Sequence, residues 1–254
     1  MKTLFSLLVI SFKRAILSTR FLASVCGVTL VLFLTSFGMI NPLSDVLSVV
    51  KTTGGGNMIL VVGILPLIPF ATTFASEWEE GSASFWLVRS GVRNYAVSKV
   101  VVSAFSGTLT TFAGILLYAL ILLIKLPFFS TITTGDAYAP LLEAGMPVRY
   151  LLYSAAHLSL SSALFAVAAL WISTYIPNRF TALAAPTVLY FALYRLTRFW
   201  DLPLYLNLGT IIEGTYHAGS PQATILFKLG TVTILCLLMG YGIVGQIRRR
   251  LQND

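Results

Sequence analysis

Residues 97–124, VSKVVVSAFSGTLTTFAGILLYALILLI, decide the fold class of this chain. The stretch contains one charged side chain, Lys99, close to its beginning. An α-helix needs roughly 20 apolar residues to cross a bilayer core of about 30 Å, and this run exceeds that length. It also lacks the alternation of polar and apolar residues that marks a strand of a membrane barrel. The stretch therefore predicts a membrane-spanning α-helix.

The rest of the chain has the same character. Of its 254 residues, 57% are hydrophobic and 10% are charged, which leaves too few polar groups to cover a water-soluble fold. Five further apolar runs are long enough to predict spans, and they cover residues 21–40, 58–75, 151–175, 180–196 and 223–245. We therefore expect an all-α membrane protein that forms a single transmembrane domain over residues 1–254, with six transmembrane helices.

The positive charges orient these spans, because Lys and Arg in short loops favour the cytoplasmic side of a membrane. Most of them fall on one side if both termini are cytoplasmic, including Arg248, Arg249 and Arg250 after the last span. We interpret the formal net charge of +8 as a topology signal, and we expect no nucleic-acid partner. The expected location is the bacterial cytoplasmic membrane.

Residues 1–20 predict an amphipathic helix that lies in the inner membrane interface with its cations toward lipid phosphates. At 100° per residue, one face of this helix is apolar. That face is formed by Leu4, Phe5, Leu8, Val9, Phe12, Ala15 and Ile16. The alternative is a partly inserted lead-in to the first span. Residues 201–222, in contrast, combine glycine and proline with many apolar side chains, which predicts short extracellular helices before the last span.

Residues 77–94 concentrate charge between the second and third expected spans. Glu77, Glu79 and Glu80 are three of only nine acidic residues in the chain. Gly81 and Gly91 favour a break in this segment. The expected form is a short helix with the acidic residues near its start and Arg89 and Arg93 near its end, because these charges suit the helix dipole. Aromatic anchors ringed by charge suit the groove of a partner protein, whereas the alternative is a solvated loop whose aromatic rings rest on lipid headgroups. The residues that we assign to this docking surface are Glu77, Glu79, Glu80, Gly81, Phe85, Trp86, Arg89 and Arg93.

The run Glu77-Trp78-Glu79-Glu80-Gly81, with Leu87, Arg89, Arg93, Tyr95 and Lys99 after it, resembles the cytoplasmic coupling region of type-2 ABC exporter permeases. The expected layout of an interfacial helix, six spans and two cytoplasmic termini is similar as well. The resemblance implies that the chain pairs with a second permease, identical or related, and sits on two copies of an ABC ATPase subunit. It implies that residues 77–94 transmit ATP-driven motion, with a shorter second contact at residues 176–179.

The chain itself has no motif of an ATPase. Its glycine run at residues 54–57, GGGN, lacks the Lys-Ser or Lys-Thr ending of a phosphate-binding loop. We therefore expect no enzyme activity and no cofactor in this chain, with ATP and Mg bound by the partner ATPase. The two histidines show no spacing typical of a zinc helix, so we expect no metal site.

His157, Ser161 and Lys228 are candidates for a substrate path through the membrane. The alternative for His157 and Ser161 is helix packing by small polar residues, and the alternative for Lys228 is an amine that extends to the membrane surface. An ionisable residue inside a span also leaves open a secondary transporter or channel subunit, the second function class that we consider.

Overall fold

The computed structural model of this chain describes residues 2–38, 40–41, 44–56, 58–130, 135–197, 203, 212 and 216–253. Within these ranges the regular elements are helices and there are no strands, so the all-α prediction is confirmed. The α-helices are α1 (Lys2–Ile16), α2 (Thr19–Ser36), α3 (Val46–Gly56), α4 (Thr73–Glu79), α5 (Ala83–Ser90), α6 (Val92–Leu122), α7 (Ala139–Glu143), α8 (Pro147–Tyr175), α9 (Arg179–Thr197) and α11 (Pro221–Asn253).

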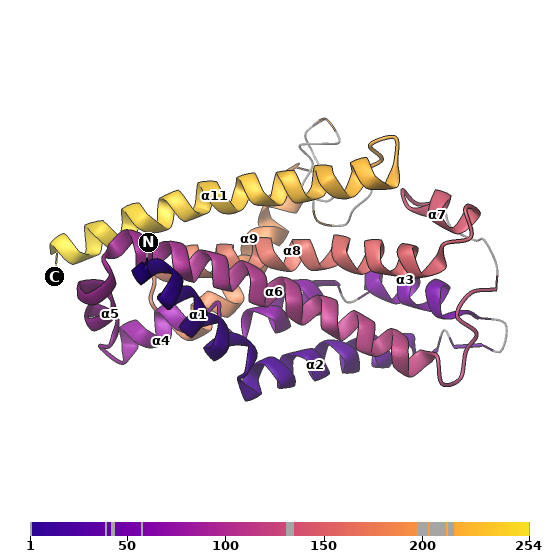
Figure 1. The fold of residues 1–254 in the computed structure, drawn as a ribbon, viewed down its shortest axis with the longest axis horizontal. Coiled ribbons are helices and arrows are strands. Elements are labelled where there is room, and N and C mark those ends of the chain that lie inside the picture. Colours follow the sequence, from indigo (N-terminus) through magenta and orange to yellow (C-terminus); the bar gives the residue numbers. More distant parts are fainter. Residues whose placement is uncertain are drawn as a thin grey trace.

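The long helices α6, α8 and α11 pack side by side and run the length of the molecule (Figure 1). Helix α2 packs against α6, and α9 packs against α8. Four of these helices, α2, α6, α8 and α11, are long and apolar enough to cross a membrane. The transmembrane class is therefore supported by four helices, and the count of six spans remains a prediction.

The second expected span, residues 58–75, departs from regular α-helix. A π-helix at Ile59–Ile64 is followed by a 3-10 turn at Leu65–Leu67 and then by further turns before α4 begins. Pro66 and Pro69 lie in this stretch and lack the N–H that would continue the α-helical ladder. In α9, Pro186 lies within the helix. The helices expected over residues 201–222 fall almost wholly outside the described residues.

Small residues allow the bundle helices to approach closely, as they do in other membrane bundles. A Cβ atom on Gly114 of α6 would lie 2.5 Å from Val28 Cγ1 of α2. A Cβ atom on Gly107 of α6 would lie 2.8 Å from the backbone oxygen of Ser162 on α8. Thr29 Oγ1 also donates a hydrogen bond of 3.1 Å to the Gly114 carbonyl. The glycines of α6 therefore set its spacing from α2 and α8.

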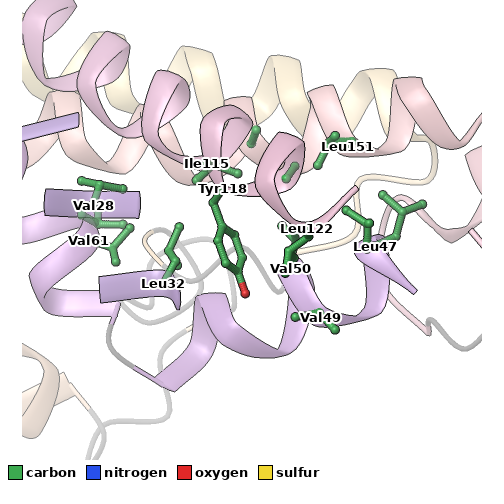
Figure 2. Close-up of a cluster of buried hydrophobic side chains, with 14 of the residues drawn as sticks. Val28, Leu32, Leu47, Val49, Val50, Val61, Ile115, Tyr118, Leu122 and Leu151 are labelled. Carbon is green, nitrogen blue, oxygen red and sulfur yellow. The ribbon is translucent and has the colours of Figure 1, made fainter. Parts of the chain in front are cut away.

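A hydrophobic cluster fills the space between α2, α3 and α6 (Figure 2). Tyr118 of α6 is completely buried at its centre, with its hydroxyl 3.5 Å from Thr53 Oγ1 of α3. Leu32 of α2 and Val50 of α3 belong to the same cluster. The cluster holds α3 against the long helices. Helix α3 also forms one wall of a cavity at this end of the bundle.

The two ends of the bundle differ. At one end, hereafter the α5 end, lie α4, α5, the N-terminus and the C-terminal turns of α11 (Figure 1). At the other, hereafter the α7 end, lie α3 and α7 (Figure 1). Helix α1 packs on α6, and its apolar face is divided: Leu8, Phe12, Ala15 and Ile16 pack on the bundle, whereas Phe5 and Val9 are exposed. An interfacial position for α1 remains a prediction.

Candidate functional site

The segment between α4 and α6 forms a short helix bounded by two glycines. Gly81 has a φ of 69° and Gly91 a φ of 76°, a region that residues with a Cβ rarely adopt. The chain therefore breaks at both glycines, but the short helix does not have the expected extent: the acidic residues lie before it and Arg93 lies in α6 after it. Between them, α5 lies at the end of the molecule (Figure 1), with the Gly91 N–H bonded to the Leu87 carbonyl at 2.9 Å.

Helix α5 has one buried face and one exposed apolar face. Ala83 and Leu87, four residues apart, are buried against the bundle. Phe85 is 78% exposed and Val88 is 88% exposed. Trp86 is half-buried and packs on a cluster that contains Leu87. Because Phe85 and Val88 remain exposed in the folded chain, α5 offers an apolar surface to another molecule.

Charged side chains border this apolar surface. Glu79, Glu80, Arg89 and Arg93 are all exposed. Of the eight residues that the sequence assigned to a docking surface, these four, Gly81 and Phe85 lie at the surface, and Trp86 lies partly there. The remaining residue of the eight, Glu77, is buried.

Glu77 is 2% exposed and joins three helices through one carboxylate. Its Oε1 accepts from Lys99 Nζ of α6 at 2.7 Å and from Arg14 Nη1 of α1 at 3.0 Å. Its Oε2 accepts from the Tyr95 hydroxyl at 2.6 Å. A buried carboxylate stays charged only when it is paired and hydrogen-bonded in this way. Glu77 therefore lies inside the protein, where a docked partner would not touch it.

The Lys99 amine makes further contacts besides its hydrogen bond to the Glu77 carboxylate. It donates a second hydrogen bond of 3.2 Å to Thr73 Oγ1 and lies 5.0 Å from the ring centroid of Phe70. A cation over an aromatic face gains electrostatic stabilisation, more so when it is desolvated. The cluster of Arg14, Thr73, Glu77, Tyr95 and Lys99, hereafter the Glu77 cluster, thus binds α1, α4 and α6 together directly behind α5.

The loop at residues 176–179, expected as a second partner contact, lies against the end of α4. Arg179 Nε is 2.8 Å from Glu79 Oε2, and its Nη2 is 2.6 Å from Glu80 Oε1. The backbone N–H of Arg179 also donates to Glu79 Oε1 at 3.1 Å. These pairs are exposed, so they add little stability, but they join the two expected contact segments into one continuous surface.

Sequence reasoning missed the role of Arg250 at the end of α11. Its guanidinium carbon lies 5.1 Å from the centroid of the Trp78 ring. Its Nε donates to the Thr174 carbonyl at 2.6 Å, and its Nη2 donates to the Tyr175 carbonyl. These carbonyls belong to the last turn of α8, where no intrahelical donor is available and a cation is favourable. Arg250 therefore ties α4, α8 and α11 at the α5 end.

The three residues expected to line a path gather between α8 and α11. Ser161 Oγ donates to the Ile212 carbonyl at 2.9 Å, and Lys228 Nζ donates to the same oxygen at 3.2 Å. Lys228 is only 3% exposed, so its amine is held inside the protein and does not extend to the surface. His157 lies one turn from Ser161 on α8, and its Nδ1 is 2.6 Å from the Tyr138 hydroxyl.

A cavity of about 590 Å³ lies beside His157 at the α7 end. Its wall combines apolar residues of α3 and α8 with a polar rim, in which Lys51 Nζ is 3.4 Å from Asp136 Oδ2. The Tyr150 hydroxyl donates to the same Asp136 oxygen at 2.6 Å. Sequence reasoning missed this cavity because its walls come from segments far apart in the chain. Among the described residues, no group of three or more His, Cys, Asp or Glu side chains is placed to hold a metal ion.

Comparison with protein-family models, with curated proteins and with solved structures finds no match to this chain.

Proposed function

We propose that this chain is the permease subunit of an ATP-driven type-2 ABC exporter in a bacterial cytoplasmic membrane. Two copies of a separate ABC ATPase subunit and a second permease, identical or related, complete the transporter. The observation that carries the proposal is α5, a short helix between α4 and the long α6 that exposes Phe85 and Val88 at one end of the bundle.

The surface around α5 has the composition of a protein interface. Interfaces are anchored by aromatic side chains that enter a partner's pocket, surrounded by polar groups that select the partner. Phe85 supplies the anchor, while Arg89 and Arg93 on one side and Glu79 and Glu80 on the other supply charge of both signs. The matching ATPase surface has an apolar pocket for Phe85 and acidic groups near Arg89 and Arg93, whereas Glu79 and Glu80 are already paired with Arg179 of this chain.

The position of α5 suits the transmission of motion. Only Gly91 separates α5 from α6, so a displacement of α5 reaches the base of a helix 31 residues long. The Glu77 cluster holds α1 and α4 to the same part of α6. Separating a buried ion pair costs about 3–5 kcal/mol, so α1, α4 and the base of α6 would move as one body. Closure of ATP-bound partner subunits would thereby reach the spans without local unfolding.

In this proposal ATP and Mg are bound by the partner ATPase, and both termini of the chain are cytoplasmic at the α5 end. Membrane lipid or the second permease covers the exposed apolar side chains of the long helices. They are most frequent on α11, most of whose apolar segment is exposed.

The test is affinity purification of the chain from its native membrane in mild detergent, with Phe85→Ala compared against Phe5→Ala. Both phenylalanines are highly exposed, Phe85 on α5 and Phe5 at 70% on α1, so the pair controls for loss of surface apolarity. Removing an interface anchor costs about 2 kcal/mol or more, which weakens binding roughly 30-fold. We expect an ATP-binding protein to co-purify with the parent chain and with Phe5→Ala, and to be lost with Phe85→Ala. Equal recovery with both variants would reject the docking role of α5.

A secondary transporter or channel subunit is the second candidate function, and one observation favours it. Lys99 and Lys228 are buried on two helices long enough to span a membrane, and buried ionisable residues in spans often mark ion pathways. The discriminating measurement is reconstitution of the chain alone in liposomes with a proton or sodium gradient. Dissipation of the gradient without any ATPase would favour this second function over the exporter.

A further inference from the structure

The cavity at the α7 end has a charged rim. Helix α8 begins at Pro147, so Tyr150 lies in its first turn and Leu158 lies eight residues further along, about 12 Å at 1.5 Å per residue. Both residues line the cavity. Asp136 accepts a hydrogen bond from the Tyr150 hydroxyl and pairs with Lys51, so these charges gather at the Tyr150 end. The cavity therefore extends inward from a charged rim at the end of the bundle.

The inner part of the cavity is apolar. Ile115 lies seven residues before the last residue of α6, about 10 Å inside the bundle, close to the depth of Leu158. The other apolar side chains of the wall are Leu47, Val50, Met58, Leu151 and Ala155. The volume of about 590 Å³ lies within the range of roughly 300–1,000 Å³ that is typical of pockets for small molecules. One alkyl chain suits this space, because each buried CH₂ group stabilises a complex, whereas the two long chains of a phospholipid exceed it.

The two charges at the rim compensate each other. Lys51 Nζ lies 3.4 Å from Asp136 Oδ2. His157 and His217 also line the cavity and are formally neutral at pH 7. An anionic group beside the pair is repelled by Asp136 about as strongly as it is attracted by Lys51, and the reverse holds for a cationic group. Since a charge that leaves water without a partner is costly, the rim favours a head group without net charge.

The rim offers hydrogen-bond donors to such a head group. The Lys51 ammonium has three N–H donors and no acceptor, and its side chain is 39% exposed. Its distance from Asp136 exceeds the length of a charge-assisted hydrogen bond, about 2.7–2.9 Å, so its donors can reach a ligand. The Asp136 carboxylate, in contrast, already accepts from the Tyr150 hydroxyl at 2.6 Å and from the Tyr138 N–H at 3.1 Å. The head group that fits therefore carries oxygen atoms that accept from Lys51.

We propose that this cavity binds an uncharged, single-chain amphiphile. Its alkyl chain occupies the apolar interior beside Ile115 and Leu158, and ester or hydroxyl oxygens of its head group accept hydrogen bonds from Lys51 at the rim. The site lies within one chain, at the opposite end of the bundle from α5. The proposal therefore stands independently of the exporter function, and its test needs no ATPase.

The test is photolabelling of the full chain in nanodiscs of phosphatidylcholine at pH 7. The probe is monodecanoylglycerol with a diazirine at the end of its acyl chain, and mass spectrometry locates the linked residues. The probe also labels helix faces that contact lipid, but an excess of unlabelled monodecanoylglycerol removes only the links made in a site of fixed capacity. We expect such competed links at Met58, Ile115 and Leu158 and their neighbours. Because phosphatidylcholine is present throughout, competed links also show that a two-chain lipid does not fill the cavity.

The choice of head group is tested with decanoate, which is anionic, and decyltrimethylammonium, which is cationic. We expect both to compete severalfold less well than monodecanoylglycerol. In Lys51→Met, Asp136 lacks its cation, so decyltrimethylammonium should gain up to about fivefold relative to monodecanoylglycerol, the effect of a partly exposed ion pair. Comparing this ratio between variant and parent cancels the different partitioning of the two compounds into the bilayer. Lys125→Met, an exposed lysine outside the cavity, should leave the ratio unchanged.

A second variant, Leu158→Trp, fills the inner part of the cavity and should lose the competed links. Leu152→Trp, at an exposed position on the same helix, should keep them. Lys51→Met changes an exposed side chain, so it tests the proposal even if Leu158→Trp does not fold. Links that no excess of competitor reduces, competed links confined to exposed faces such as that of α11, unchanged labelling in Leu158→Trp, or an unchanged ratio in Lys51→Met would overturn the proposal.

Discussion

Lys99 of α6 and Glu77 of α4 form an ion pair with 2.7 Å between Nζ and Oε1, and their side chains are only 5% and 3% exposed. The pair is completed by Arg14, which reaches the same carboxylate oxygen from α1. A charge cluster this deep is retained because every member has a partner, and removing one member leaves the others desolvated and uncompensated. The connection between α1, α4 and α6 at the α5 end therefore depends on one carboxylate.

Lys99→Met should destabilise the chain by about 3 kcal/mol, the lower end of the cost of breaking a buried pair, because Arg14 still reaches Glu77. The double variant Glu77→Gln with Lys99→Met should recover much of the loss, since no uncompensated carboxylate remains. The measurement is thermal unfolding in detergent. Lys125→Met, an exposed lysine outside the cluster, is the control and should shift stability by less than about 0.5 kcal/mol. If the double variant lost as much free energy of unfolding as Glu77→Gln and Lys99→Met lose separately when added together, the two side chains would not depend on each other in this way.

Arg250→Ala should loosen the last turns of α11 and of α8, because it removes the donor to the Thr174 carbonyl and the cation over the Trp78 ring. The measurement is amide hydrogen exchange, in which we expect faster exchange for residues 246–253 and for the end of α8. Arg249→Ala removes the same charge from an exposed position one residue earlier and should leave the exchange unchanged. Similar exchange in both variants would show that charge alone, and not the contacts of Arg250, holds this end together.

Hydropathy predicts most of the long helices but not their ends. Helix α11 continues to Asn253, well past the apolar run that ends at residue 245, because Arg and Gln continue an α-helix where the apolar signal has stopped. Residues 58–75 are apolar except for Thr72 and Thr73, yet residues 59–67 form a π-helix and a 3-10 turn. Pro66 and Pro69 indicate a disturbance of that span, but its form depends on how neighbouring helices satisfy the freed backbone groups.

The sequence predicts those features of the candidate site that depend on the conformation of neighbouring residues. It does not predict those that depend on contacts between distant parts of the chain. Gly81 and Gly91 indicate breaks by their own conformational freedom, and Phe85 is exposed on the helix that they delimit. The burial of Glu77 follows from Arg14 and Lys99, which are 63 and 22 positions away along the chain. Nothing in the spacing of residues 77–94 distinguishes Glu77 from Glu79 and Glu80. The cavity beside His157 escapes prediction for the same reason.

Gly114→Ala should destabilise the chain by about 1–3 kcal/mol, because the new Cβ would lie 2.5 Å from Val28 Cγ1. Adding Val28→Ala removes the colliding atoms and should restore part of the loss. Gly230→Ala on α11 is the matched control: it meets nothing within 4 Å, so the better helix propensity of alanine should leave stability unchanged or slightly higher. Thermal unfolding of the variants in detergent measures these differences. If Gly114→Ala proved as stable as Gly230→Ala, close approach of α2 and α6 would not depend on this glycine.

Asp45, just before α3, makes the stability of the α7 end depend on pH. Burial alone would raise the pKa of Asp45, but hydrogen bonds from Ser48 and Ser130 outweigh it, and the pKa lies below its ordinary value. The carboxylate accepts from the Ser48 N–H at 2.7 Å and from the Ser130 N–H and hydroxyl at 3.1 Å each.

A carboxyl whose pKa is depressed by folding stabilises the native state above its unfolded pKa, about 3.9, and this contribution is lost as pH falls through the folded pKa. Asp45→Asn should therefore cost about 1 kcal/mol at pH 7, because an uncharged amide replaces the carboxylate that accepts from Ser48 and Ser130. The difference should shrink as the pH is lowered below about 4, because the unfolded parent then binds a proton before its native state does, and the charge contributes nothing once the native carboxyl is protonated too. Thermal unfolding of parent and variant from pH 7 to pH 3 measures this convergence. A difference that stays constant over the whole range would mean that the charge of Asp45 adds nothing and that its hydrogen bonds work equally well from a neutral side chain.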